Sequence, residues 1–358
     1  MKAIKAIFLL SSLIFLSNCG SDDSVNTDSI IIPNSFTVDV PSSISSNTGA
    51  LSGRTNGDGD GFIEGDEIYE SLRGFIYVAE ESAEIVEFVL DVAEELEKAE
   101  VTSFTFTGEE DGREKRISLA QNVTKGGATF QFEMTVFDTE NEDQALQLVW
   151  SANPIEGIAI INPYHLERTG GANPETFIRI SYSENLFGYQ EGMQVQIAGL
   201  EAEENGDIDN MALFVGRNGE EVDVIGNSNH PNLVIVDEGF IGGRAYAFVG
   251  RANETTNIAV VDLALPPSSA SSTTDLFEDY SVFSVLEEEI ESAGIVDQTT
   301  IDAILVEAQS PAYFDATGFV TSGEANKPLD FSAIFVDLTG LTPFVPSEVQ
   351  NLKISFVQ

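Results

Sequence analysis

The sequence predicts an α+β fold, in which a long N-terminal amphipathic helix packs on a large curved antiparallel sheet and two shorter helices lie near the C-terminus. Two periodicities predict it: apolar residues recur every three or four positions over residues 67–100, and side chains alternate in polarity over residues 102–265. With 42% hydrophobic residues and 24 phenylalanines, the chain of 358 residues has enough apolar surface for a sizeable core. We therefore expect a single α+β domain over residues 56–358.

The apolar positions of residues 67–100 share one face of a helix, because steps of three and four follow the helical period. A helix over this span would be roughly 50 Å long, and Gly74 is the position where we expect it to bend. Its other faces carry many glutamates, so the helix needs a broad apolar surface to lie against. The predicted apolar stripe consists of Ile68, Leu72, Phe75, Ala79, Ala83, Val86, Leu90, Ala93 and Leu96.

The segments over residues 102–265 supply such a surface. Phe130, Phe132 and Met134 alternate with polar neighbours, which is typical of a strand with one buried face. Turn signals such as Asn218-Gly219 separate the segments, and their short spacing predicts consecutive antiparallel strands rather than parallel strands joined by helices. Further strand candidates lie at residues 104–106, 146–150, 178–182, 193–197, 211–215, 221–225, 233–236, 245–249 and 258–263.

Two shorter helices are predicted over residues 275–310, after the break at Pro266 and Pro267. The first should end near Gly294, and the second should run from about residue 300 to residue 308. Polarity alternates again at residues 331–336 and 352–356, which predicts terminal strands within residues 311–358 that close the sheet. The apolar face of the first helix consists of Phe277, Tyr280, Phe283, Leu286 and Ile290.

Residues 1–18 have the pattern of a signal peptide, with two lysines before an apolar run over residues 7–16. This run is too short for a membrane-spanning helix, which needs about 20 apolar residues. Leu16, Ser17, Asn18 and Cys19 follow, and Cys19 is the only cysteine, so no internal disulfide can form. These four residues resemble the lipobox of bacterial lipoproteins, except that Asn18 replaces a smaller residue.

The lipobox resemblance implies cleavage before Cys19 and attachment of diacylglycerol to its thiol. An ordinary secretory signal with an incidental cysteine is the alternative. The residues that follow, Gly20, Ser21, Asp22 and Asp23, are similar to the acidic export signal of surface lipoproteins of Bacteroidota, flavobacteria especially, although a solvated acidic linker would have the same composition. This second resemblance implies an anchor in the cell outer membrane that faces outward, with residues 19–55 as a flexible tether.

The charge balance limits the partners. The chain has 60 acidic and 16 basic side chains, a net charge of −44, and removal of residues 1–18 takes away two lysines and no acid. Such a surface repels nucleic acid and anionic lipid headgroups. The expected partners are therefore the membrane, through the lipid anchor, and an unidentified small-molecule, lipid or protein ligand, with no nucleic acid among them.

Residues 56–67, directly before the long helix, are rich in glycine and acids. They resemble the 12-residue calcium loop of EF-hand and dockerin-type proteins, with Gly61 at the sharp turn. Two features depart from that pattern: the first ligand is an Asn rather than an Asp, and no helix is expected before the loop. The alternative is a chance match in an acidic chain. If the loop binds calcium, the ion would stiffen the start of the long helix. The resemblance implies side-chain ligands from Asn56, Asp58 and Asp60, the carbonyl of Phe62, Glu64 directly or through water, and both carboxylate oxygens of Glu67.

Catalytic motifs are missing. His165 and His230 are the only histidines, and the patterns of zinc, serine and cysteine hydrolases do not occur, so no catalytic residue is assigned. We favour a non-enzymatic binding or structural lipoprotein, which would be similar to periplasmic lipid carriers if the sheet enclosed an apolar cavity. The other hypothesis is a surface glycan hydrolase with paired carboxylates, although Trp150 is the only tryptophan for sugar stacking.

Overall fold

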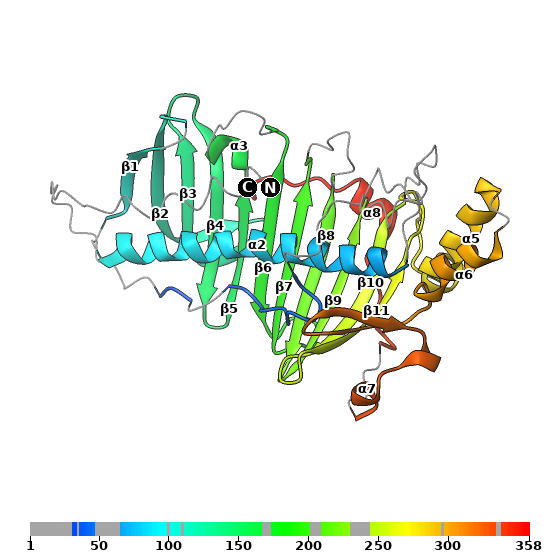
Figure 1. Cartoon of the computed structure of the whole chain (residues 1–358). Coiled ribbons are helices and arrows are strands. Elements are labelled where there is room, and N and C mark those ends of the chain that lie inside the picture. Colours follow the sequence, from blue (N-terminus) through cyan, green and yellow to red (C-terminus); the bar gives the residue numbers. More distant parts are fainter. Residues whose placement is uncertain are drawn as a thin grey trace. The chain divides into compact units, whose positions relative to one another are not determined.

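The computed structural model describes residues 31–33, 36–46, 65–98, 101–108, 111–166, 173–200, 209–229, 244–294, 297–333 and 338–358 (Figure 1). Over these residues the main feature is an antiparallel sheet of 13 strands, which follow one another in chain order from β1 to β13. The antiparallel sheet predicted from the alternating polarity is therefore confirmed. Where the sequence predicts one domain, the chain divides into two compact units, and each is described below by itself.

Unit 1 contains the described residues before Val38, together with Ser82–Glu184 and Ile354–Gln358. Its strands are joined by tight turns, and Gly126 and Gly127 turn between the second and third strands with φ of 57° and 83°, which glycine adopts without a steric penalty. The register places Phe132 opposite Trp150 and Met134 opposite Leu148. The elements are β1 Ser103–Thr107, β2 Glu114–Lys125, β3 Ala128–Asp138, β4 Asp143–Ala152, β5 Ile155–Ile161, the short helix α3 Pro163–Leu166 and β6 Phe177–Glu184.

Unit 2 contains Val38–Glu81 and Asn185–Lys353. Its strands are β7 Glu191–Ala198, β8 Met211–Asn218, β9 Glu221–Ser228, β10 Tyr246–Asn253, β11 Ile258–Ala264, β12 Ala312–Asp315 and β13 Gly318–Ser322. Its shorter helices are α4 Leu276–Asp279, α5 Val282–Ala293, α6 Gln298–Val306, α7 Leu329–Ala333 and α8 Pro346–Gln350, with the 3-10 helix η2 Glu324–Asn326. The strand candidate at residues 233–236 lies outside the described residues.

The long helix α2 occupies Gly65–Lys98, and the helical assignment continues through Gly74. Its residues up to Glu81 belong to unit 2 and those from Ser82 to unit 1. All nine residues of the predicted stripe are buried. In unit 2 the ring of Phe75 meets Phe248 of β10 edge-on, with 5.6 Å between the ring centroids. No helix in the described part of the chain is long and apolar enough to cross a membrane.

The tether predicted for residues 19–55 is too long, because residues 36–46 pack into the fold. In unit 1, Phe36 is fully buried, and its ring contacts Tyr182 at 5.4 Å between centroids. Gly157 makes room for this ring, since a Cβ there would lie 2.3 Å from it. In unit 2, Val38 and Ile44 are buried as well. The apolar surface of this segment therefore outweighs its loop-like composition.

The first of the predicted C-terminal helices is interrupted. It forms two helices, α4 and α5, because Ser281 caps a new helix by accepting a hydrogen bond from the backbone N–H of Ser284. Gly294 ends α5 with φ of 71°, as expected for a left-handed cap. Because α5 begins a new helix at Val282, its buried face differs from the predicted one. The buried residues are Val282, Val285, Leu286 and Ile290, whereas Phe277, Tyr280 and Phe283 are only half-buried.

The predicted terminal strands are wrong in part. Strands β12 and β13 lie within residues 311–358, but Phe331 lies in α7, where its ring packs against Tyr313 at 5.3 Å. Pro328 precedes α7, and proline favours the start of a helix. Residues 352–356 form no strand, and residues 334–337 lie outside the described chain.

Candidate functional site

Most of the residues predicted for lipidation and calcium binding lie outside the described chain: Cys19, Asn56, Asp58, Asp60, Phe62 and Glu64. Glu67 is described, and it lies in the first turn of α2 beside Asp66. Acidic side chains at this end of a helix face its partial positive charge. Among the described residues, no group of three or more His, Cys, Asp or Glu side chains is arranged to hold a metal ion.

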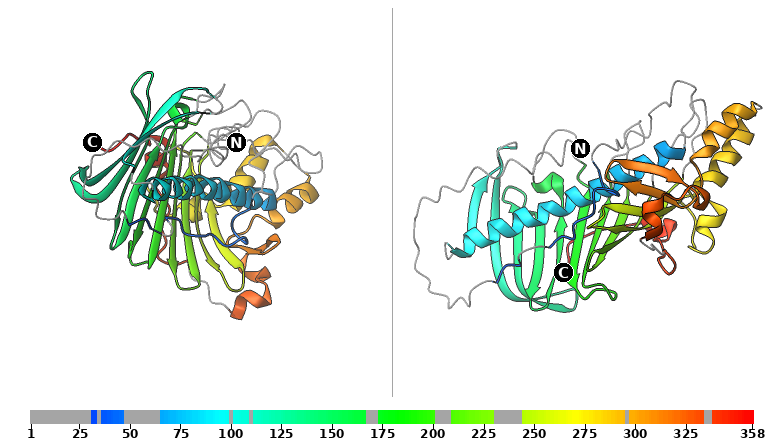
Figure 2. Two further views of the ribbon diagram at one scale, coloured as in Figure 1. Left: turned by 90° about the vertical axis from the view of Figure 1, so that its left-hand side faces the viewer. Right: turned by 60° about the horizontal axis from the view of Figure 1, so that its bottom comes forward.

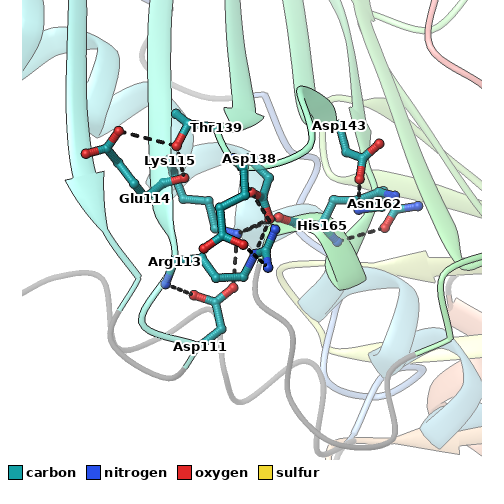
Figure 3. A network of polar contacts seen from close by, with 10 residues as sticks. Asp111, Arg113, Glu114, Lys115, Asp138, Thr139, Asp143, Asn162 and His165 are labelled. Carbon is teal, nitrogen blue, oxygen red and sulfur yellow. Dashed lines mark hydrogen bonds and ion pairs between the residues drawn. The ribbon is translucent and has the colours of Figure 1, made fainter.

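The most deeply buried group of charges in the described part of unit 1 lies where β2 and β3 meet α3 (Figure 3). The side chain of Lys115 is fully buried. Its ammonium donates to Asp111 at 3.0 Å, to Asp138 at 3.1 Å and to the backbone carbonyl of His165 at 3.0 Å. An ammonium has three N–H donors, so these acceptors satisfy it completely. We call Asp111, Arg113, Lys115 and Asp138 the Lys115 cluster.

Arg113 completes the cluster from the turn before β2. Its guanidinium donates to both carboxylate oxygens of Asp138, through Nε to Oδ2 and through Nη2 to Oδ1 at 2.9 Å. Burial opposes the charge on Asp138, but the hydrogen bonds from Arg113 and Lys115 outweigh it and hold the pKa of that carboxyl well below its usual range. Asp138 is therefore held as a carboxylate and is a poor proton donor.

Local backbone geometry explains how the cluster forms. Asp111 accepts a hydrogen bond from the backbone N–H of Arg113 at 2.9 Å, and Gly112 between them has φ of 65°. The β2–β3 register then places Lys115 directly opposite Asp138. Cross-strand partners share one face of a sheet, so the two charges meet beside the turn.

His165 lies next to this cluster but takes part in it through its backbone. Its ring nitrogen Nδ1 is 3.6 Å from Asp143, and its backbone N–H donates to the side chain of Asn162 at 3.0 Å. His230 lies outside the described residues. Trp150 is fully buried, and its indole N–H donates to the carbonyl of Ile31 at 3.0 Å. Trp150 is therefore a core residue, not a platform for a sugar.

Unit 2 has a comparable ion pair on β9 and β10. Arg251 donates to both carboxylate oxygens of Asp223, with Nη2 to Oδ2 at 2.8 Å, and the hydroxyl of Tyr189 donates to the same Oδ2 at 2.7 Å. Burial and the Asp223 carboxylate raise the pKa of Tyr189 well above its usual value. The phenol therefore stays protonated and holds the loop before β7 against the sheet.

In unit 2, the charge of one carboxyl, Glu324, acts on another, Asp262. Burial, and in addition the charge of Glu324, raise the pKa of Asp262, which accepts a hydrogen bond from Ser310. Glu324 has an exposed side chain and accepts a hydrogen bond from the hydroxyl of Tyr313 at 3.0 Å. A carboxyl with a raised pKa near a second, exposed carboxyl is similar to the arrangement of a catalytic acid–base pair. No sequence motif predicted this pair, because its members are 62 positions apart.

No protein-family model, curated protein or solved structure matches the chain.

Proposed function

We propose that the protein is a lipoprotein, anchored by diacylglycerol on Cys19 in the cell outer membrane and facing outward, whose folded part has a non-enzymatic binding or structural role. The Lys115 cluster is the observation that carries the non-enzymatic part. Its ammonium has no lone pair to act as a base or nucleophile, and its carboxylate is held ionised.

The chemistry of these buried charges supports a rigid scaffold. The Lys115 cluster links two strands and α3 in unit 1, and the Arg251–Asp223 pair links two strands in unit 2. Buried ion pairs of this kind fix geometry more than they contribute net stability. A rigid domain suits the presentation of a fixed surface to a partner.

The anchor rests on the lipobox-like residues that end at Cys19 and on the acids that follow. Its test is expression of the full chain in a bacterium of the Bacteroidota, fed with an alkyne-labelled fatty acid. The wild-type protein should carry the label and remain in the outer membrane, and Cys19→Ala should lose both properties. Protease added to intact cells should degrade the wild type but spare the double variant Asp22→Ala, Asp23→Ala. An unlabelled wild-type protein would overturn the proposal.

The ligand belongs to the same proposal: an apolar molecule carried by the fold, with a calcium ion at residues 56–67 stiffening the start of α2. The position of Glu67 in the first turn of α2 supports the calcium part. Native mass spectrometry of the detergent-solubilised full chain, with and without chelator, tests both. We expect the mass of one calcium ion, which the chelator removes, and the mass of a co-purified apolar ligand. A mass that corresponds to the protein alone at millimolar calcium would refute both parts.

A second candidate function is favoured by the Asp262–Glu324 pair. In this alternative, Asp262 is the general acid and Glu324 the second carboxylate of a glycan hydrolase. The test is a panel of fluorogenic glycosides, with Asp262→Asn, Glu324→Gln and the exposed control Glu288→Gln. Loss of at least 100-fold in both variants, with the control unchanged, would support hydrolysis. A wild-type rate equal to the uncatalysed rate on every glycoside would exclude it on this panel.

A further inference from the structure

The residues Ile354–Gln358, called here the 354–358 segment, run extended across unit 1 without joining its strands (Figure 1). The side chain of Gln147 on β4 binds the backbone of Val357 in this segment. Its Nε2 donates to the carbonyl of Val357 at 3.0 Å, and its Oε1 accepts from the backbone N–H of Val357 at 2.8 Å. One side chain thus makes both hydrogen bonds that a neighbouring strand would make to one residue.

Gln147 is held in place for this task. Its side chain is almost fully buried, and its Nε2 also donates to Glu133 of β3 at 2.9 Å. Glu133 in turn pairs with Lys125 at 2.9 Å, and this ion pair fixes the carboxylate that orients the Gln147 amide. Without the segment, the Gln147 amide would lose both of its hydrogen bonds to Val357, and the backbone of another extended chain would supply the same donor and acceptor.

Contacts on either side of Gln147 complete the recognition. The backbone N–H of Gly126 donates to the carbonyl of Gln358 at 2.8 Å, and a Cβ on Gly126 would lie 2.9 Å from the side chain of Val357. The ring of Phe356 packs edge-on against Phe177 of β6, with 5.6 Å between centroids. Main-chain hydrogen bonds with contacts for alternate side chains are how proteins recognise extended peptides.

The segment lies on the opposite face of the unit 1 sheet from the part of α2 that belongs to this unit (Figure 2). Gln147 alternates along β4 with Leu146 and Leu148, so its side chain points to the other face from theirs. Ile354 and Phe356 are half-buried and Ser355 between them is exposed. The hydrogen bonds of Val357 and Gln358 to Gln147 and Gly126, together with the ring contact of Phe356, hold the segment on this face.

The preceding part of the chain is fixed independently within unit 2. Asn210 donates to the carbonyls of Val349 and Gln350 at 3.1 Å and 3.0 Å, and Asn227 donates to that of Phe344 at 2.9 Å. Release of the 354–358 segment thus does not require release of α8.

We propose that unit 1 contains a binding site for an extended peptide, formed by Gly126, Gln147 and Phe177, which the chain's own 354–358 segment closes. The partner is a peptide with the pattern of that segment: apolar residues at the positions of Ile354 and Phe356, a polar residue between them, and free backbone groups at the position of Val357. The site recognises the main chain through a neutral amide, so it requires no charge on the peptide.

The test uses the substitution Val357→Pro in the full chain, which removes the backbone N–H that donates a hydrogen bond to Gln147 Oε1. This loss should release the 354–358 segment and leave the site open. A fluorescent peptide with the sequence of residues 351–358 is then titrated, and anisotropy measures its binding. The variant should bind the peptide at least tenfold more tightly than the wild type, whose own segment competes. Adding Gln147→Ala should weaken binding at least tenfold, whereas the neighbouring control Gln144→Ala should not change it.

Two results would overturn the peptide site. One is absence of binding to a Val357→Pro protein whose circular dichroism equals that of the wild type. The other is equal affinity with and without Gln147→Ala. If Val357→Pro does not fold, a chain ending at Leu352 replaces it and is judged by the same comparison. A peptide N-methylated at the position of Val357 should fail to bind in either background, because it lacks the N–H.

Discussion

Replacement of Asp138 by asparagine tests the role of the Lys115 cluster directly. The substitution keeps the shape of the side chain but removes the charge that Arg113 and Lys115 share. Lys115 would keep Asp111 and the carbonyl of His165 as acceptors, so its ammonium would not be isolated. Arg113 would keep Glu140 at 2.6 Å, but the buried Lys115 would be left with one carboxylate, Asp111, instead of two.

The expected loss follows from the burial of the pair. Neither Asp138 nor Lys115 has any exposed side-chain surface, and removal of one partner of a buried pair destabilises by roughly 3 to 5 kcal/mol. We expect the lower end, about 3 kcal/mol, because the asparagine oxygen still accepts one hydrogen bond and Lys115 keeps two partners. For a unit of this size, this loss lowers the melting temperature by roughly 6 to 12 °C.

A matched control lies on the next residue of β2. Arg116 pairs with Glu142 through two hydrogen bonds, but both side chains are exposed, at 36% and 61%. Glu142→Gln should therefore destabilise the fold much less than Asp138→Asn, and salt should abolish that small effect. Asp138→Asn should retain its effect in high salt. Urea unfolding in low and high salt measures both variants, and equal losses for the two would refute the structural role of the cluster.

Four further outcomes are expected. The pKa of Asp138 is lowered in the folded state, so its contribution to the free energy of unfolding is complete above the pKa of the unfolded chain, near 4, and is lost as the pH falls. The urea midpoint of the wild type should therefore drop more steeply below pH 4 than that of Asp138→Asn. The pKa of Asp262 is raised in the folded state, so its contribution to the free energy of unfolding is present at low pH and is lost as the pH rises through the pKa of the folded protein. Asp262→Asn should make the free energy of unfolding, measured in urea, decline less with rising pH. Glu67→Gln should abolish any rise in melting temperature caused by millimolar calcium, which calorimetry detects. Phe36→Ala should cost roughly 3 to 5 kcal/mol in urea unfolding, a loss that a flexible tether would not produce.

The periodic elements could be predicted because their periods record which face is buried. The stripe of α2 and the alternation of β3 both describe contact with a core, and the structure buries those same residues. Phe36, Val38 and Val40 have the same alternating pattern, but the surrounding composition is typical of a linker and predicts a tether instead. Composition therefore misleads where a short apolar segment lies among polar residues.

The 354–358 segment shows why alternation alone does not identify a strand. Its apolar side chains alternate and are half-buried as the pattern predicts, yet its backbone partner is the side chain of Gln147. A period of two reports side-chain burial but not which groups pair with the backbone. That information lies 210 positions away, in a residue whose sequence context is an ordinary strand.

The Lys115 cluster could not be predicted for a similar reason. Lys115 and Asp138 meet only because the β2–β3 turn sets a register that places them opposite each other. Among 60 acidic residues, no local pattern distinguishes Asp138 from the others. The Asp262–Glu324 pair depends in the same way on how β11 and η2 fold around Ser310 and Tyr313.

The distribution of cations connects these clusters to the kind of partner that the protein can bind. In the described chain, the few basic side chains are placed mainly as internal links: Lys115 is fully buried, Arg73 is 4% exposed, and Arg244 is 12% exposed beside Glu289. Acidic side chains outnumber basic ones by 60 to 16, which makes the net charge of the chain strongly negative. Anionic ligands are therefore repelled, whereas neutral or cationic ones are not. The proposed peptide site satisfies this constraint, because it replaces charge with an amide, a backbone N–H and an aromatic ring.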